Sequence, residues 1–222
     1  TYGMYKVCAE VNDVEYRSVP LNADFSLNAD ALLAATDANT KIIWICSPNN
    51  PTGNDLDRDE VLRVINEFKG IVVVDEAYSD FSNLIPLRYQ IDRFPQLIVL
   101  NTFSKAWASA SIRLGMAFSS EMIIALFNKV KYPYNVNRLT LLLGEKTVEA
   151  EVYYREKCEE IMETREWTAK QLEELGFTVL PSQTNFVFAK TDKKLDIKGC
   201  KSFFFIYVND STFQKFAPIT AF

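Results

Sequence analysis

The sequence contains no histidine. This absence excludes Ser-His-Asp triads and Cys-His pairs, and it removes a common ligand of zinc sites. Glycine is also scarce, with seven residues in 222, and a G-x-G-x-x-G dinucleotide-binding loop is excluded. Acid–base chemistry must therefore come from lysine, tyrosine, aspartate or glutamate, or from a cofactor. We predict no metal site.

No long basic run and no long apolar run occurs. The net charge of −5 argues against a nucleic-acid partner. No apolar segment approaches the roughly 20 residues of a membrane span, and the first residues show no signal-peptide pattern. We therefore expect no membrane partner. A length of 222 residues allows one large domain, or one domain and part of another.

The four cysteines lie far apart and form no C-x-x-C pair; they are Cys8, Cys46, Cys158 and Cys200. Cys46 lies inside an apolar run. This position favours buried free thiols in a reducing compartment over disulfides. We accordingly expect a cytoplasmic protein.

Apolar runs of strand length alternate with amphipathic stretches. Helices are expected over residues 1–12, 29–36, 57–70, 121–131 and 139–175. Strands are expected over residues 14–19, 41–46, 71–78, 97–100, 114–118, 177–180 and 185–189. The continuous apolar run 41–46 suits a sheet covered on both faces. The alternation predicts an α/β fold with a mainly parallel sheet over residues 1–150, followed by part of a smaller domain over 151–222.

Polar side chains stand just beyond three of these strands. They are Asn50, Asp75 and Lys105. Because the carboxyl ends of parallel strands form a ligand crevice, we expect the three to converge there. Singly, each has an ordinary explanation, as a turn residue, a cap and a surface lysine. Together they indicate a cofactor site.

Pyridoxal phosphate needs such groups. Lys105 is the candidate for its Schiff base and for proton transfer, and Asp75 would keep the pyridine nitrogen protonated. Tyr78 and Asn50 would bind the ring oxygen. Tyr2 would stack on the ring, although a packing aromatic is the ordinary explanation for such a residue. The hydroxyls and the guanidinium around the lysine would hold the phosphate; they belong to Thr102, Ser104 and Arg113.

These residues occur in recognisable motifs, namely SPNNPTG at 47–53, DEAY at 75–78, SKA at 104–106 and RLG at 113–115. Their order and approximate spacing resemble the fold-type I, class II-type aminotransferases over about residues 1–191. Within that family, the opening TYGMY, the doubled asparagine at 49–50 and the YNVN segment at 134–137 resemble the histidinol-phosphate aminotransferases.

The resemblance implies transamination between glutamate/2-oxoglutarate and imidazole-acetol phosphate, a step of histidine biosynthesis, with pyridoxal 5'-phosphate as cofactor. It implies an α/β/α large domain with a seven-stranded type of sheet, a smaller α+β domain, and a homodimer with the site at the subunit interface. It also implies a cis Asn50-Pro51 peptide bond.

The sequence departs from the family pattern in two ways. Family members extend upstream of Tyr2, where a loop helps to hold the phosphate, so we expect this chain to be a fragment. Downstream, the family has a substrate-binding arginine in the small domain, whereas no arginine follows Arg165. From about Lys193 the sequence no longer follows the family, although the apolar run 203–208 suits a strand.

Three alternatives stay open at this point. The chain could belong to another fold-type I enzyme, such as an aromatic aminotransferase or a threonine-phosphate decarboxylase-like enzyme. It could be the aminotransferase-like ligand-sensing domain of a transcription regulator. It could also be an inactive fragment that retains the motifs.

Overall fold

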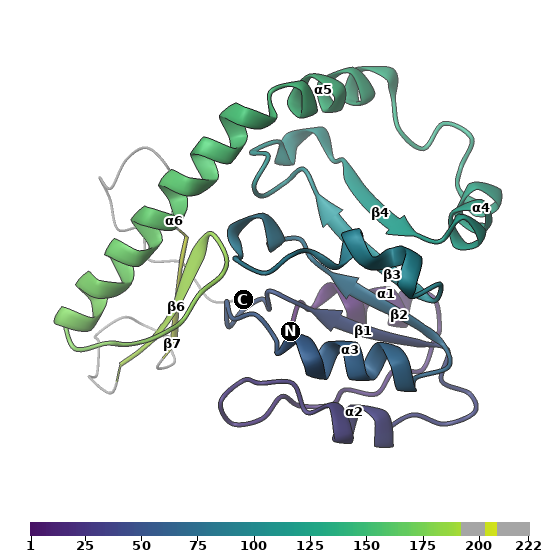
Figure 1. The fold of residues 1–222 in the computed structure, drawn as a ribbon, viewed down its shortest axis with the longest axis horizontal. Coiled ribbons are helices and arrows are strands. Elements are labelled where there is room, and N and C mark those ends of the chain that lie inside the picture. Colours follow the sequence, from purple (N-terminus) through teal and green to yellow (C-terminus); the bar gives the residue numbers. More distant parts are fainter. Residues whose placement is uncertain (192–202, 208–222) are drawn as a thin grey trace.

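The larger of two β-sheets forms the centre of the chain in this computed structural model, which describes residues 1–191 and 203–207 (Figure 1). Its strand order is β1-β2-β3-β4, with β1 at Ile42–Cys46, β2 at Ile71–Asp75, β3 at Leu97–Thr102 and β4 at Gly115–Ser119. The first three strands are parallel, and β4 is antiparallel to β3. The predicted mainly parallel sheet is confirmed. Within the described residues this sheet has four strands, whereas the resemblance implied a sheet of seven-stranded type.

Helices cover both faces of this sheet. The short helix α2 (Ala29–Ala34) and α3 (Arg58–Glu67) bury one face, and α4 (Glu121–Val130) packs on the other. Helices α2 and α3 each begin at a residue whose side chain caps the helix. Asn28 Oδ1 accepts the Ala31 N–H at 2.9 Å, and Asp57 Oδ1 accepts two N–H groups of the first turn of α3. These caps fix where the helices start beside the strands.

Two local expectations are wrong. Residues 14–19 form no strand, because no strand of the described residues pairs with this alternating segment. The run 41–46 is not covered on both faces: β1 lies at the edge of the sheet, and Ile42 and Trp44 remain 47% and 44% exposed. Periodicity shows which side chains avoid water, but it does not show whether a covering element is present.

The expected single helix over 139–175 is two helices, α5 (Arg138–Glu149) and α6 (Glu151–Glu174). The break falls at Ala150, whose backbone leaves the helical region with φ −93° and ψ 23°. Gly176, with φ +87°, follows the end of α6, as expected for a left-handed C-terminal residue. In Figure 1, α5 and α6 run along the outside of the molecule from the larger sheet to the smaller one.

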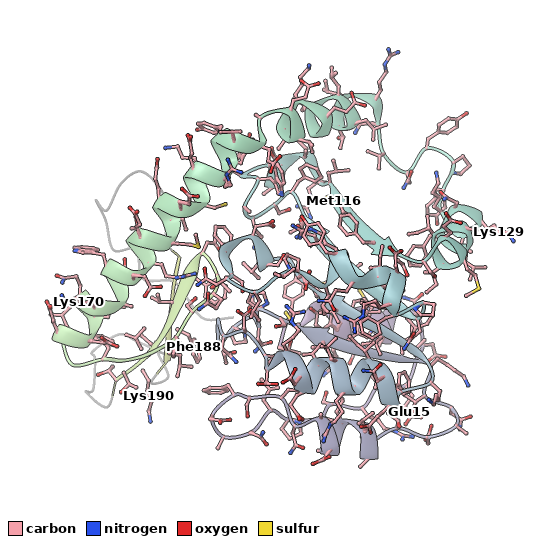
Figure 2. The ribbon with its side chains drawn as sticks, viewed as in Figure 1. Glu15, Met116, Lys129, Lys170, Phe188 and Lys190 are labelled. Atoms are coloured by element: carbon pink, nitrogen blue, oxygen red, sulfur yellow. The ribbon has the colours of Figure 1, made fainter. Side chains whose placement is uncertain are left out.

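The smaller sheet is antiparallel, in the order β5-β6-β7, with β5 at Thr178–Leu180, β6 at Phe186–Lys190 and β7 at Phe203–Tyr207. The strand expected at 203–208 is thus present in its described part, and Val208 lies outside the described residues. Leu172 of α6 packs on Val187 and Ala189 of β6. Figure 2 places Lys170 of α6 and Phe188 of β6 in this part of the chain, away from Met116 of β4.

One buried arginine joins this smaller part to the larger sheet. Arg165 of α6 is 4% exposed, and its Nη1 donates to the carbonyl oxygens of Phe81 and Thr184 at 3.2 and 3.0 Å. Phe81 ends the short 3-10 helix η1 (Ser79–Phe81), which follows β2, whereas Thr184 precedes β6. Arg165 therefore positions the smaller sheet beside the carboxyl ends of the larger one.

Candidate active site

The three polar residues predicted to converge do so at the carboxyl end of the larger sheet. Asp75 is the last residue of β2, Asn50 lies four residues after β1, and Lys105 lies three residues after β3. Because β1, β2 and β3 are adjacent and parallel, their ends meet at one edge. The topology thus brings an amide, a carboxylate and an amine together.

The loop 47–53 presents Asn50 to a tyrosine. Asn50 Nδ2 donates to the Tyr78 hydroxyl oxygen at 3.1 Å. The Asn50-Pro51 peptide bond is cis, which confirms the prediction, and the Ser47-Pro48 bond, for which no prediction was made, is cis as well. Tyr78 is 3% exposed, and burial raises the pKa of Tyr78 to about 12. The Tyr78 hydroxyl therefore stays protonated at neutral pH and can donate a hydrogen bond.

Lys105 lies beside the same tyrosine. Its Nζ is 5.1 Å from the centre of the Tyr78 ring, and the side chain is half-buried. In the part of the chain that the structure describes, Lys105 forms no ion pair. The amine is held by a ring face, with no carboxylate neutralising it, so it remains available to an incoming carbonyl group.

Asp75 receives two hydrogen bonds. Its Oδ1 accepts the Ala77 N–H at 3.1 Å, and its Oδ2 accepts the Tyr5 hydroxyl at 2.6 Å. Tyr5 comes from the first helix, α1 (Met4–Val11), and its ring stacks on Trp44 of β1 with centroids 5.0 Å apart. Sequence reasoning missed Tyr5. The available signals were its place in the TYGMY segment and its position three residues after Tyr2 in the helix expected over residues 1–12.

The other predicted cofactor-binding residues make fewer contacts with Asn50, Asp75, Tyr78 and Lys105. Tyr2 is 47% exposed and meets Tyr5 edge to face at 5.7 Å. Thr102 Oγ1 accepts the Ser104 N–H at 3.1 Å and so shapes the turn before the lysine. Arg113 is exposed, and its Nη1 donates to a nearby backbone carbonyl at 3.0 Å. Phosphate binding by this group remains a prediction.

A second missed residue links the lysine strand to the Asp75–Tyr78 segment. The buried Asn101 amide nitrogen lies 3.2 Å from the Glu76 carbonyl oxygen and 3.2 Å from Asp80 Oδ2. Asn101 Oδ1 accepts the Thr102 N–H at 2.6 Å. The amide thus ties the end of β3 to the segment after β2. No feature of the sequence distinguishes this asparagine from a turn residue.

Glu76 is the most deeply buried carboxylate beside the site. Oε1 accepts the Leu87 N–H at 2.8 Å, and Arg58 Nη1 lies 3.8 Å away. Oε2 has no hydrogen-bond partner among the described residues. Burial raises the pKa of Glu76 to about 7, and the attraction of Arg58 and Arg88 offsets only part of that effect.

The smaller sheet closes one side of the site. The Phe186 ring of β6 meets the Tyr78 ring edge to face at 5.3 Å. The Gln183 N–H donates to the Gly53 carbonyl at 2.6 Å. Gly53 has φ +84°, and a Cβ there would lie 2.9 Å from Ser182 Oγ. Glycine at this position therefore permits both the turn and the close approach of the two segments.

In the described part of the chain, the cysteines and acidic residues form no metal site. Cys46 and Cys158 are free and buried as expected, whereas Cys8 is free but exposed, contrary to the expectation, and Cys200 lies outside the described residues. Within the described ranges, no group of three or more histidine, cysteine or acidic side chains is arranged to hold a metal ion. Within these same ranges, no helix combines the length and the apolar character that crossing a membrane requires.

Comparison with known proteins places this arrangement in a family. The model of the family "aminotransferase class I and II" matches residues 1–208. The chain belongs to this family. It is 49% identical over 203 residues to a histidinol-phosphate aminotransferase of Bacteroides thetaiotaomicron, with 89% of this chain and 58% of that protein covered. The chain thus spans 58% of the length of this curated relative.

Solved structures share the fold. The histidinol-phosphate aminotransferase from Clostridium acetobutylicum superposes with a TM-score of 0.84 at 19% identity, covering 95% of this chain and 71% of that one. The enzyme of that name from Sinorhizobium meliloti, solved in complex with pyridoxal-5'-phosphate, gives a TM-score of 0.79 at 23% identity, with 86% and 53% covered. The α/β class predicted from the sequence is therefore confirmed.

Proposed function

We propose that this chain is the cofactor-binding part of a pyridoxal-phosphate-dependent aminotransferase. The reaction would exchange an amino group between glutamate/2-oxoglutarate and imidazole-acetol phosphate/L-histidinol phosphate. The convergence of Lys105, Asp75 and the Asn50–Tyr78 pair at one sheet edge carries this proposal. The family membership and the curated relative called a histidinol-phosphate aminotransferase support the substrate, and they favour it over the three alternatives.

The side chains present fit the cofactor. When bound, pyridoxal phosphate supplies an aldehyde that captures amines and a protonated ring that accepts electrons. Lys105 would hold the aldehyde carbon through Nζ and would move a proton there, since no ion pair occupies this amine among the described residues. Asp75, with acceptor capacity beyond its two hydrogen bonds, would accept from the ring nitrogen.

The remaining groups would orient the ring and exclude water. Asn50 and the protonated Tyr78 hydroxyl are already joined at 3.1 Å and would bind the ring oxygen. Phe186 packs against Tyr78 and shields that side of the site. Tyr2 would stack on the ring. The phosphate would bind near the hydroxyls and the guanidinium that flank the lysine, from Thr102, Ser104 and Arg113.

Three further features belong to the same proposal. A homodimer is supported by large apolar side chains that are exposed on α4 and α5, namely Leu126, Phe127, Val130, Leu139, Leu142 and Leu143. A division into a large part, 1–150, and a small part, 151–222, is supported by the helix break at Ala150. A cytoplasmic location is supported by the free thiols of Cys46 and Cys158.

The lysine is tested by reductive trapping. The 222-residue chain is incubated with pyridoxal phosphate, reduced with borohydride and mapped by peptide mass spectrometry. We expect one adduct, on Lys105. It should disappear in Lys105→Ala and persist in the matched control Lys129→Ala, which changes an exposed lysine of α4. An adduct that survives Lys105→Ala, or that spreads evenly over surface lysines, would contradict the proposal.

The substrate is tested separately by following glutamate formation from 2-oxoglutarate. L-histidinol phosphate is expected to be a better amino donor than L-phenylalanine, and Lys105→Ala should abolish the reaction. Faster turnover with phenylalanine would assign an aromatic substrate instead. Release of carbon dioxide from L-threonine phosphate would assign a decarboxylase. Size-exclusion chromatography with light scattering measures the dimer in the same samples.

A further inference from the structure

Among the side chains of residues 1–191, the Tyr5 hydroxyl is the only one that the structure shows donating to Asp75. The donor and acceptor are 70 residues apart in sequence, and their oxygen atoms are 2.6 Å apart. We propose that Tyr5 is a positioning residue, which holds the Asp75 carboxylate in the orientation that receives the cofactor's ring nitrogen. This inference rests on the proposed function and assigns a role to the last residue of the TYGMY segment, for which the sequence alone suggested none.

Packing fixes Tyr5 independently of Asp75. Its ring stacks on Trp44 with an interplanar angle of 27°, and the Tyr2 ring meets it edge to face. Trp44 belongs to β1, which pairs with β2, so the tyrosine is anchored on the strand beside the one that carries Asp75. An anchored donor can orient a carboxylate, whereas a mobile surface tyrosine could not.

Electrostatics keep the hydroxyl in its donating form. Burial raises the pKa of Tyr5, and the nearby Cys46 thiol and Asp75 carboxyl act in the same direction. A neutral phenol can only donate to the charged Asp75. The hydrogen bond is therefore charge-assisted, which is the stronger kind and agrees with its short length.

Asp75 retains room for a further donor. A carboxylate offers about four lone-pair sites, and the Tyr5 hydroxyl and the Ala77 N–H use two of them. The two donors reach different oxygens, so they fix the plane of the carboxylate as well as its position. A third donor, the ring nitrogen, would then meet an acceptor that needs no reorientation.

The test separates action through Asp75 from general loss of structure. Dissociation constants of the chain are measured for pyridoxal phosphate and for 1-deazapyridoxal phosphate, which lacks the ring nitrogen. In Tyr5→Phe the stacked ring is kept and only the hydroxyl is lost. We expect the preference for pyridoxal phosphate over the deaza compound to fall by about tenfold, the lower end of what a hydrogen bond to a charged group is worth. Tyr89→Phe, at a tyrosine that is 71% exposed, should leave the preference unchanged.

A double-mutant cycle completes the test. In an Asp75→Asn background, Tyr5→Phe should no longer alter the preference, because the residue through which it acts has been changed. An equal loss of affinity for both compounds would show a merely structural role and would overturn the inference. Tighter binding of pyridoxal phosphate by Tyr5→Phe would also overturn it, since Tyr5 would then be a competitor for Asp75. If the parent chain forms no Lys105 adduct, the proposed function itself fails; if the adduct forms and the preference is unchanged, only the role of Tyr5 fails.

Discussion

Replacing Glu76 with glutamine tests whether burial disfavours the charged form of this carboxyl group, which lies beside the candidate site. The carboxylate side chain is 3% exposed, and only its Oε1 has a hydrogen-bond donor, the Leu87 N–H, among the described residues. Burial raises the pKa of Glu76 from 4.5 to about 7. Glu76→Gln keeps the acceptor oxygen and nearly the same volume while it removes the charge.

The sign of the effect follows from proton linkage. The folded protein holds the Glu76 proton up to about pH 7, whereas the unfolded chain releases it near pH 4.5. Between these values the folded state binds more protons, so the contribution of Glu76 to stability falls as pH rises. At about 1.4 kcal/mol for each pH unit, the loss is on the order of 3 kcal/mol and is complete above pH 7. Solvent screening lowers this free-energy difference only slightly, because the carboxylate is almost fully buried.

The assay is urea unfolding of the parent and Glu76→Gln chains at a series of pH values from 5 to 8. We expect the free energy of unfolding of Glu76→Gln, relative to the parent, to rise with pH by an amount on the order of 3 kcal/mol. Glu67→Gln changes an exposed glutamate of α3 and should show no such trend. A stability difference that stays constant across this range would refute the reasoning, whatever its absolute value.

Two further predictions concern the contacts between the larger and the smaller part of the chain. Gly53→Ala should lower the free energy of unfolding by about 1–2 kcal/mol from backbone strain at φ +84°, and by more because the added Cβ would lie 2.9 Å from Ser182 Oγ. Gly3→Ala is the control, since its Cβ meets no atom within 4 Å, and urea unfolding measures both. Arg165→Met should lower the free energy of unfolding by an amount on the order of 3 kcal/mol, because the buried carbonyls of Phe81 and Thr184 lose their donor. Arg155→Met, at an exposed position of the same helix, is the matched control in thermal and urea unfolding, and an equal effect of the two substitutions would contradict the argument.

The placement of the candidate site could be predicted because the patterns that indicate it are local. Asn50, Asp75 and Lys105 each follow an apolar run, and such runs form buried strands whichever neighbours they acquire. Parallel pairing then brings their ends together without further instruction. The cis bond before Pro51 was predicted in the same way, from a short motif and the family that it resembles.

The sequence by itself therefore determined the fold class and the strands that end at the candidate site, and it selected the amine, amide and carboxylate that we propose to bind the cofactor. Only the tertiary structure decided that Tyr5 reaches Asp75 and that Asn101 bridges two strand ends. It also decided that the alternating run at 14–19 pairs with no strand of the described part of the chain. The physical reason is that local patterns record which side chains avoid water. Which distant partner a polar group meets depends instead on how helices and strands pack, and that is a property of the whole chain.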